Sequence, residues 1–153
     1  MTTSTPTLAF GPLQIYEVAD PRFRRVGQVL VGLPLFGIAL GLSVEAALGV
    51  NPWTVFHGGV ALQTPLSIGA VTILTGLVLL STFPIYGEPM GLGTLLNVTL
   101  VGTFTDLTIA VVPDLESMPA RMAALGVAPA LIGLASGLYI GAGLGPGPRD
   151  GIM

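Results

Sequence analysis

The sequence predicts an all-α protein: a polytopic helical membrane protein with four transmembrane helices and one short re-entrant or interfacial helix. Only 8% of its residues are charged, 52% are hydrophobic, and the mean hydropathy is +0.86. A soluble domain carries about 25% charged residues. Long stretches with at most one charged residue supply the roughly 20 apolar residues that a helix needs to cross the hydrocarbon. The predicted spans are Val26–Leu48, Ile68–Ile85, Gly93–Val112 and Met122–Ile140.

The polar residues of the chain argue against several functional classes. All five basic residues are arginines, and they form no patch for nucleic acid. The absence of cysteine rules out disulfides and thiolate metal sites. The chain also has no HExxH motif, no acidic metal cluster and no Ser/His/Asp spacing typical of a hydrolase. We therefore expect neither an enzyme nor a bound cofactor or metal, and we expect the lipid bilayer, not nucleic acid, as the main partner.

The arginines also predict how the chain is oriented. Arg22, Arg24 and Arg25 lie just before the first span, and the positive-inside rule places them in the cytoplasm. Residues 1–25 are thus expected to be a cytoplasmic N-terminal segment of a multi-pass protein of the cell (inner) membrane. The polar start of the chain lacks the basic residues of a cleavable signal, so the first span is expected to insert the chain and remain.

An internal repeat predicts the domain organisation. Residues 35–57 return without gaps as residues 131–153, with nine identities in 23 positions, where roughly two are expected by chance. Because three spans separate the starts of the two copies, the second copy is inverted in the membrane. We expect one three-span unit over residues 26–112 and the start of a second, inverted unit over 113–153. The complete form would be a six-span, 3+3 inverted repeat, so this chain is expected to be truncated.

Small residues recur at the same place in both copies. Gly37 and Gly41 in the first span have Gly133 and Gly137 as counterparts in the fourth. Glycines four residues apart let two helix backbones approach closely. Their recurrence in both copies predicts that the first and fourth spans cross each other near a pseudo-two-fold axis, although glycine is also simply frequent in this chain.

The connection between the first two spans is neither a polar loop nor a span. Asn51 and Pro52 break the helix, and Pro52 suits the first turn of a new one. Trp53–Leu62 is apolar but only about ten residues long, which is too short to cross a membrane. Ser67 is suited to N-cap the second span. Two interpretations stay open: a re-entrant helix, or an interfacial helix anchored by Trp53.

Three polar side chains in or near the apolar segments are candidates for function. Asp106 lies inside the third span, where an unpaired carboxylate costs several kcal/mol, and Asn97 lies on the opposite face of the same helix. Polar groups all round that helix predict that protein surrounds it. The alternative for Asp106 and Asn97 is a bond to the backbone at a helix break. His57, the only histidine, lies on the short helix without a second metal ligand nearby.

The stretch 141–151 contains five glycines and two prolines at the end of the fourth span. Irregular backbone at membrane depth is tolerated only where it is buried or lines a wet cavity. Pro148 would begin a further helix. The free backbone N–H groups in the first turn of that helix, beside Arg149 and Asp150, would suit an anion. A surface loop is the alternative.

Several of these segments together resemble one bacterial family. They match the pattern of the YczE/YitT-like integral membrane proteins, whose function is largely unassigned. The segments that carry the resemblance are Leu48–His57, Leu66–Gly69, Gly91–Asn97, Asp106–Leu107 and Tyr139–Gly151. The resemblance implies a membrane protein and no particular substrate.

Two departures from that pattern are visible. Thr54 stands where the family usually has Asp, whereas Asp150 keeps that residue in the second copy. Members of the family also continue well past the position of Met153.

Together these features predict a transporter or permease-like protein of unknown small-molecule or ion substrate. Asp106 would serve proton or cation coupling, facing the same site as Asn97. The alternative is a non-transporting membrane regulator or assembly partner, and a homodimer is a further open expectation. The predicted substrate-binding residues are Asn51, Pro52, Trp53, His57, Asn97, Asp106, Arg149 and Asp150.

Overall fold

A computed structural model describes residues 22–86 and 91–148, so Arg149 and Asp150 lie outside the described residues. Over these ranges the chain is all-helical and contains no strand. Four of the helices are long and apolar enough to cross a membrane, and one is short, which confirms the predicted fold class. The helices are α1 (Arg22–Ala46), α2 (Pro52–Ala61), α3 (Ile68–Tyr86), α4 (Leu92–Val111) and α5 (Met118–Ala142).

The helix ends differ from the predicted spans by a few residues. Helix α1 begins at Arg22, before the apolar stretch, and ends at Ala46 because Ala47 adopts a left-handed conformation with φ 48°. Helix α5 begins at Met118, four residues earlier than predicted, since the Ser117 side chain accepts a hydrogen bond from the Ala120 N–H. Hydropathy locates the apolar stretch of a helix, whereas capping groups decide where the helix starts and stops.

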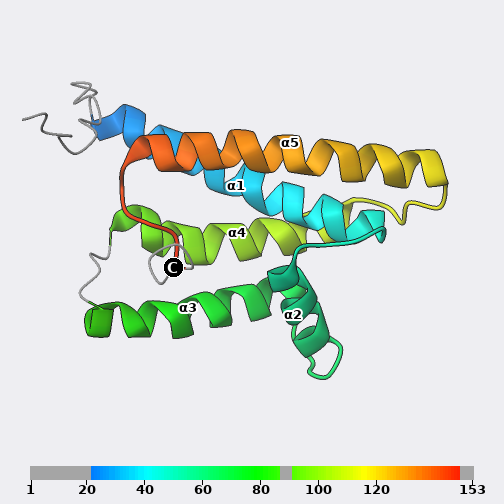
Figure 1. Cartoon of the computed structure of the whole chain (residues 1–153), viewed down its shortest axis with the longest axis horizontal. Helices are drawn as coiled ribbons and strands as arrows, with labels where there is room; N and C mark the ends of the chain where they lie inside the picture. Colours follow the sequence, from blue (N-terminus) through cyan, green and yellow to red (C-terminus); the bar gives the residue numbers. More distant parts are fainter. Residues whose placement is uncertain (1–21, 87–90, 149–153) are drawn as a thin grey trace, which may run out of the picture.

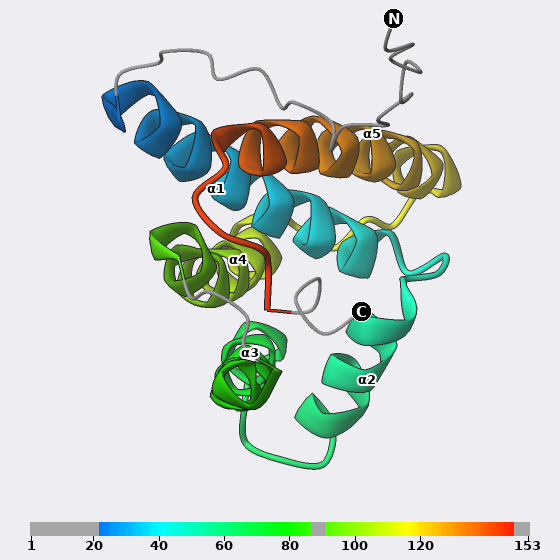
Figure 2. The same ribbon diagram turned by 60° about the vertical axis from the view of Figure 1, so that its left-hand side comes forward.

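The four long helices lie side by side, and α2 is inclined to them at one end of the molecule (Figure 1). Helix α1 packs between α5 and α4, α3 packs against α4, and α2 packs against α3 (Figure 2). Successive long helices reverse direction along the bundle, so α5 runs antiparallel to α1 (Figure 1). The two copies of the repeat therefore begin in oppositely directed helices, as an inverted repeat requires. The complete 3+3 repeat stays a prediction.

The glycines of α1 pack differently from what the sequence predicts. Helices α1 and α5 do contact each other, but at Gly32, where an added Cβ would lie 3.0 Å from the Ala135 carbonyl oxygen. Gly37 and Gly41 instead face α4, and the Thr105 hydroxyl donates to the Gly37 carbonyl at 3.2 Å. The predicted contact between the first and fourth spans is therefore present, but the glycine pairs do not form it.

Gly133 and Gly137, the counterparts of this pair, have open space where a side chain would be, with no atom within 4 Å. The spacing of four residues does place each pair of glycines on one face of its helix. Which helix packs on that face depends on how α1 is rotated about its axis.

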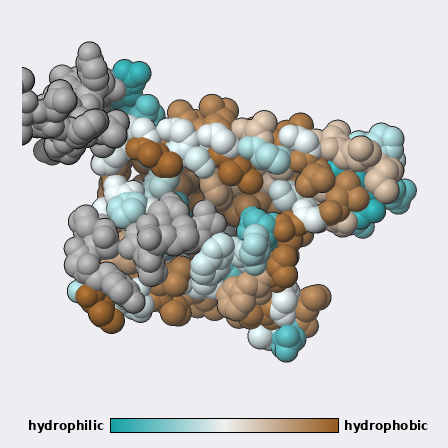
Figure 3. Space-filling view, in the orientation of Figure 1, coloured by the Kyte–Doolittle hydropathy of each residue, from teal (hydrophilic) through white to brown (hydrophobic). Residues whose placement is uncertain are grey.

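The outer surface is rich in apolar side chains, as a lipid-facing surface must be. Figure 3 shows brown, hydrophobic residues over much of the long helices, with hydrophilic colours at the ends and in a smaller group near the middle of this face. Val78 of α3, Val111 of α4 and Ile140 of α5 are each exposed by at least 65%.

Helix α4 is also partly exposed within the described residues, contrary to the prediction that protein surrounds it. Thr99 and Thr103 on its outer face donate their hydroxyl protons to carbonyls of their own helix, which lets the helix carry threonine on an exposed face.

Candidate functional site

Both copies of the repeat leave their helices through the same backbone conformation. Ala47 and Gly143, which are equivalent in the repeat, have φ of 48° and 60°. Two residues further on, Gly49 and Gly145 have φ of 142° and 119°. Positive φ favours glycine, and three of these four residues are glycines. The likeness of the two copies in sequence is therefore accompanied by a likeness in backbone shape.

The first turn, which follows α1, is held by a side chain from the start of α5. The Arg121 guanidinium donates from Nε to the Ala46 carbonyl at 2.8 Å and from Nη2 to the Ala47 carbonyl at 3.4 Å. It thus binds the carbonyl end of α1, where the helix dipole favours a cation. Asn51 then starts α2 by accepting the Thr54 N–H at 3.0 Å, and Pro52 occupies the first helical position, as predicted.

The second turn is held by the beginning of α4. The Thr94 hydroxyl donates to the Pro146 carbonyl at 2.7 Å, and the Gly93 N–H donates to the Leu144 carbonyl at 3.0 Å. The Tyr139 hydroxyl donates to the Gly145 carbonyl at 2.9 Å. These bonds satisfy the irregular backbone after α5, so it can lie inside the protein without water.

A cavity of about 500 Å³ lies between the two turns and is lined by all five helices. Its lining includes repeat-equivalent pairs from both copies: Phe36 with Ile132, Leu40 with Ser136, and Asn51 with Gly147. This volume suits a small molecule. We refer to this space below as the cavity.

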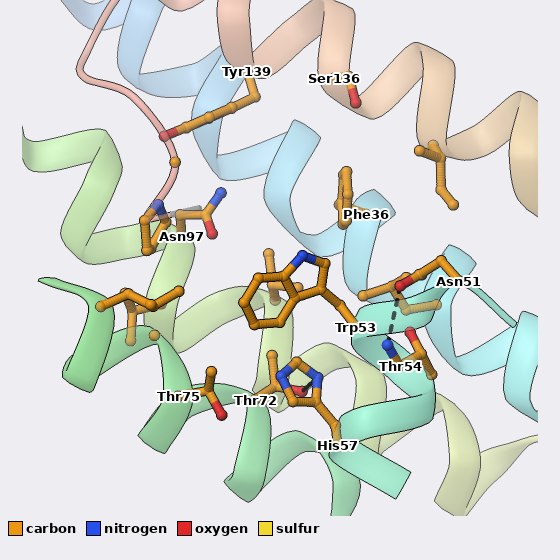
Figure 4. A pocket seen from close by; sticks show the side chains of 18 of the residues that line it. Phe36, Asn51, Trp53, Thr54, His57, Thr72, Thr75, Asn97, Ser136 and Tyr139 are labelled. Atoms are coloured by element: carbon orange, nitrogen blue, oxygen red, sulfur yellow. Dashed lines mark hydrogen bonds between the residues drawn. The ribbon is translucent and has the colours of Figure 1, made fainter. Parts of the chain in front are cut away.

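Aromatic and polar side chains meet around the cavity. Trp53 lies in the middle of the view, between His57 on one side and Phe36 on the other, with Asn97 beside it (Figure 4). The Trp53 and His57 rings have centroids 6.1 Å apart. Trp53 therefore faces inward from α2, which favours the re-entrant interpretation of this helix over a simple interfacial anchor.

His57 is buried and is held by α3. Its exposure is 8%, and its Nδ1 lies 3.0 Å from the Thr72 hydroxyl oxygen. The Thr72 hydroxyl also lies 2.8 Å from the Ile68 carbonyl oxygen. The other imidazole nitrogen, Nε2, is buried without a hydrogen-bond partner among the described groups. Burial lowers the pKa of His57 below its ordinary value of 6.5, so the ring is neutral at pH 7.

The lowered pKa predicts a loss of stability in mild acid. Below pH 6.5 the unfolded chain binds a proton at His57 that the folded chain resists, so the free energy of unfolding falls as the pH drops toward the folded-state pKa. Above pH 6.5 this contribution is fully present. Unfolding in detergent between pH 5.5 and 8, compared for wild type and His57→Gln, checks this prediction.

His57 is the only histidine in the chain. An acid-induced loss of equal size in His57→Gln would contradict the assignment of this titration to His57.

Comparison with known proteins places the chain in a family. Residues 23–153 match the model of DUF6198, described as a family of unknown function. The chain belongs to this family. It is 33% identical over 86% of its length to an uncharacterized protein of Haemophilus influenzae, covering 61% of that protein. It is 32% identical over 80% of its length to the uncharacterized membrane protein YczE of Bacillus subtilis, covering 58% of it.

A third relative, YyaS of Bacillus subtilis, is 25% identical over 72% of the chain, which covers 57% of that relative. The chain thus spans about three fifths of the length of the curated relatives it matches. No solved structure matches it significantly. The predicted resemblance to YczE-like membrane proteins is confirmed, and the four apolar helices agree with a multi-pass membrane protein.

The structure brings together half of the predicted site residues of this family member. Asn51, Trp53, His57 and Asn97 all line the cavity. Pro52 starts α2 but is exposed and is not part of the lining. Gly147 and Pro148, which directly precede Arg149 and Asp150, also line the cavity.

Asp106 lies elsewhere, at the N-terminal end of α3. Its carboxylate accepts hydrogen bonds from the Ser67 hydroxyl and, at 2.7 Å, from the Gly69 N–H. Ser67 Oγ also accepts the Ala70 N–H at 3.1 Å, so Ser67 caps α3 as predicted. Asp106 therefore stabilises the positive end of the α3 dipole from a neighbouring helix. The expectation that it faces the same site as Asn97 is wrong, because the two side chains lie on opposite faces of α4.

Sequence reasoning missed Thr72, Thr75, Ser136 and Tyr139, which also line the cavity. Single hydroxyls are common in membrane helices and carry no strong signal by themselves. Ser136 is the repeat counterpart of Leu40, which also lines the cavity. In the described residues, no group of three His, Cys, Asp or Glu side chains could hold a metal ion.

Proposed function

We propose that this membrane protein is a transporter or permease-like protein whose small-molecule substrate binds in the cavity. The observation that carries this proposal is the set of repeat-equivalent pairs in the lining, Phe36 with Ile132, Leu40 with Ser136 and Asn51 with Gly147. Inverted-repeat transporters place the substrate at the interface between their repeats, near discontinuous helices. Here both broken-helix turns and both repeat copies border one cavity.

The hydrogen bonds around the turns support the same proposal. Arg121 from the start of α5 holds the end of α1, and Thr94 from α4 holds the turn after α5. Each turn therefore depends on a helix outside its own copy. A relative movement of the copies would change these bonds and the cavity together, which is what alternating access requires.

A complete 3+3 repeat would cover the open face of α5. In such a repeat a counterpart of α4 would pack on Gly133 and Gly137, as α4 itself packs on Gly37 and Gly41. The open glycines also favour a second candidate function, a non-transporting assembly partner, in which a second copy or another membrane protein occupies this face.

Filling the cavity tests the transport proposal. Ser136 lies in the lining, and Phe at this position would occupy space needed by a substrate. Leu134 is 57% exposed on the same helix, so Leu134→Phe is a matched control outside the cavity. Proteoliposomes are incubated with a defined mixture of small metabolites, and accumulation is measured by mass spectrometry. We expect compounds that accumulate with wild type and Leu134→Phe to fall at least tenfold with Ser136→Phe.

Two results would contradict the transport proposal: no compound accumulates above empty liposomes with the wild-type protein, or Ser136→Phe transports as well as wild type. Either result would favour the second candidate function, a non-transporting assembly partner. Substitutions at Gly133 and Gly137 should then be the ones that disturb association.

A further inference from the structure

The contacts of Thr72 favour one tautomer of the His57 ring. A threonine hydroxyl has one proton to donate, and the Ile68 carbonyl can only accept. The Thr72 oxygen lies 2.8 Å from that carbonyl and donates to it. The 3.0 Å contact between Thr72 and Nδ1 is then a hydrogen bond if Nδ1–H donates to the hydroxyl oxygen. We therefore assign the proton of the neutral His57 ring to Nδ1, which makes Nε2 an acceptor.

This acceptor has no partner among the described groups. Nε2 makes no hydrogen bond with any described group and is buried, on a residue that is only 8% exposed. An unsatisfied buried acceptor is costly and needs an explanation. His57 lines the cavity, and Trp53 is its neighbour there. Because Nε2 is buried, a group in the cavity reaches it only when the side chains that cover it move aside.

Other polar groups in the cavity are also free to bind. The Asn97 carboxamide and the Thr75 and Ser136 hydroxyls all belong to the lining, and the described residues provide none of them with a hydrogen-bond partner. Figure 4 shows these side chains arranged around Trp53. An aromatic surface beside unpaired donors and acceptors is typical of a site for a planar ring with polar edges.

Building on the proposed function, we propose that His57 selects the substrate. The cavity takes a planar, ring-containing small molecule that donates an N–H or O–H to Nε2 of His57 while its ring lies against the Trp53 indole. Asn97 pairs with the remaining polar edge of the ring, because a carboxamide offers both donors and an acceptor.

Trp53, the only tryptophan of the chain, is the reporter for the test. Its fluorescence is titrated in lipid nanodiscs with two pairs of probes that differ in the donor: uracil against 1,3-dimethyluracil, and phenol against anisole. Methylation removes the donor but makes the probe more apolar, so simple partitioning into lipid predicts the opposite order. The response left in Ser136→Phe, whose cavity is filled, is subtracted as non-specific.

We expect the donor-bearing probe of at least one pair to bind wild type about tenfold more tightly than its methylated counterpart. In His57→Phe, which keeps a ring but has no acceptor, this preference should disappear. In Thr72→Val the imidazole proton is no longer held on Nδ1, so the preference should shrink while binding remains.

Equal binding of both members of each pair to wild type would overturn the role of His57, because a donor on the probe would then add nothing to the affinity. An unchanged preference for the donor-bearing probe in His57→Phe would overturn the role of His57 as well. If that variant does not fold, the comparison of the probe pairs on wild type and Thr72→Val tests the role instead. A cavity that binds no donor-bearing probe also overturns this inference. The proposed function is judged separately by the uptake experiment with Ser136→Phe, so its failure is distinguishable.

Discussion

Gly69→Ala is expected to lower the free energy of unfolding by about 3 kcal/mol, because helices α3 and α4 are in backbone contact at this residue. A Cβ on Gly69 would overlap the Gly102 carbonyl oxygen and would lie 2.5 Å from Cγ of Asp106. The first atom is backbone, and the Asp106 carboxylate is held in place by its hydrogen bonds, so neither can move away freely. The helices would have to separate, and the 2.7 Å hydrogen bond from the Gly69 N–H to Asp106 would lengthen or break. Equilibrium unfolding in mixed detergent micelles measures the change.

Gly126→Ala is the matched control for this substitution. Gly126 lies within α5, and no atom lies within 4 Å of an added Cβ. Alanine is a better helix former than glycine, so we expect this variant to be equal to wild type or more stable by up to about 1 kcal/mol. Similar losses in the two variants would show that the effect of Gly69→Ala does not arise from helix contact.

Asp106→Ala is expected to cost about 2 kcal/mol, since it removes a charged acceptor and leaves the Ser67 hydroxyl and the Gly69 N–H without it. Asp106→Asn keeps one acceptor oxygen and should lose about half as much. A double-mutant cycle between Asp106→Ala and Ser67→Ala, measured by the same unfolding experiment, should give a coupling energy of about 1 kcal/mol.

This prediction separates a structural role of Asp106 from the coupling role that its sequence context suggests. If the carboxylate anchors α3, loss of stability should follow the loss of acceptor oxygens. A variant Asp106→Ala as stable as wild type would contradict the anchoring role.

The anchoring of α3 also matters for the cavity. Thr72 lies about one helical turn after Gly69, and its hydroxyl contacts the His57 ring. The contact between α3 and α4 therefore sets where the Nδ1 partner of His57 lies. We expect variants that loosen this contact to weaken the preference for donor-bearing probes even though they do not touch the cavity.

Much of the candidate site could be predicted from the sequence because it depends on local signals. Asn51 and Pro52 start α2, and Ser67 caps α3. Each of these residues acts on backbone groups within three positions of itself. Asn51, Trp53 and His57 are polar or aromatic residues at the first broken segment, and Asn97 is a polar residue inside an apolar span. All four line the cavity.

The sequence by itself determined the membrane class, the number and approximate extent of the helices in the described residues, and the two broken segments, because hydropathy, capping and glycine content act within a few residues. Only the tertiary structure decided that Gly37 and Gly41 face α4, that Asp106 binds the start of α3, and that the Thr72 hydroxyl lies beside Nδ1 of His57. These features depend on how each helix is rotated about its own axis. That rotation is set by the packing of all its faces at once, and in an apolar helix the hydrophobic pattern does not distinguish one face from another.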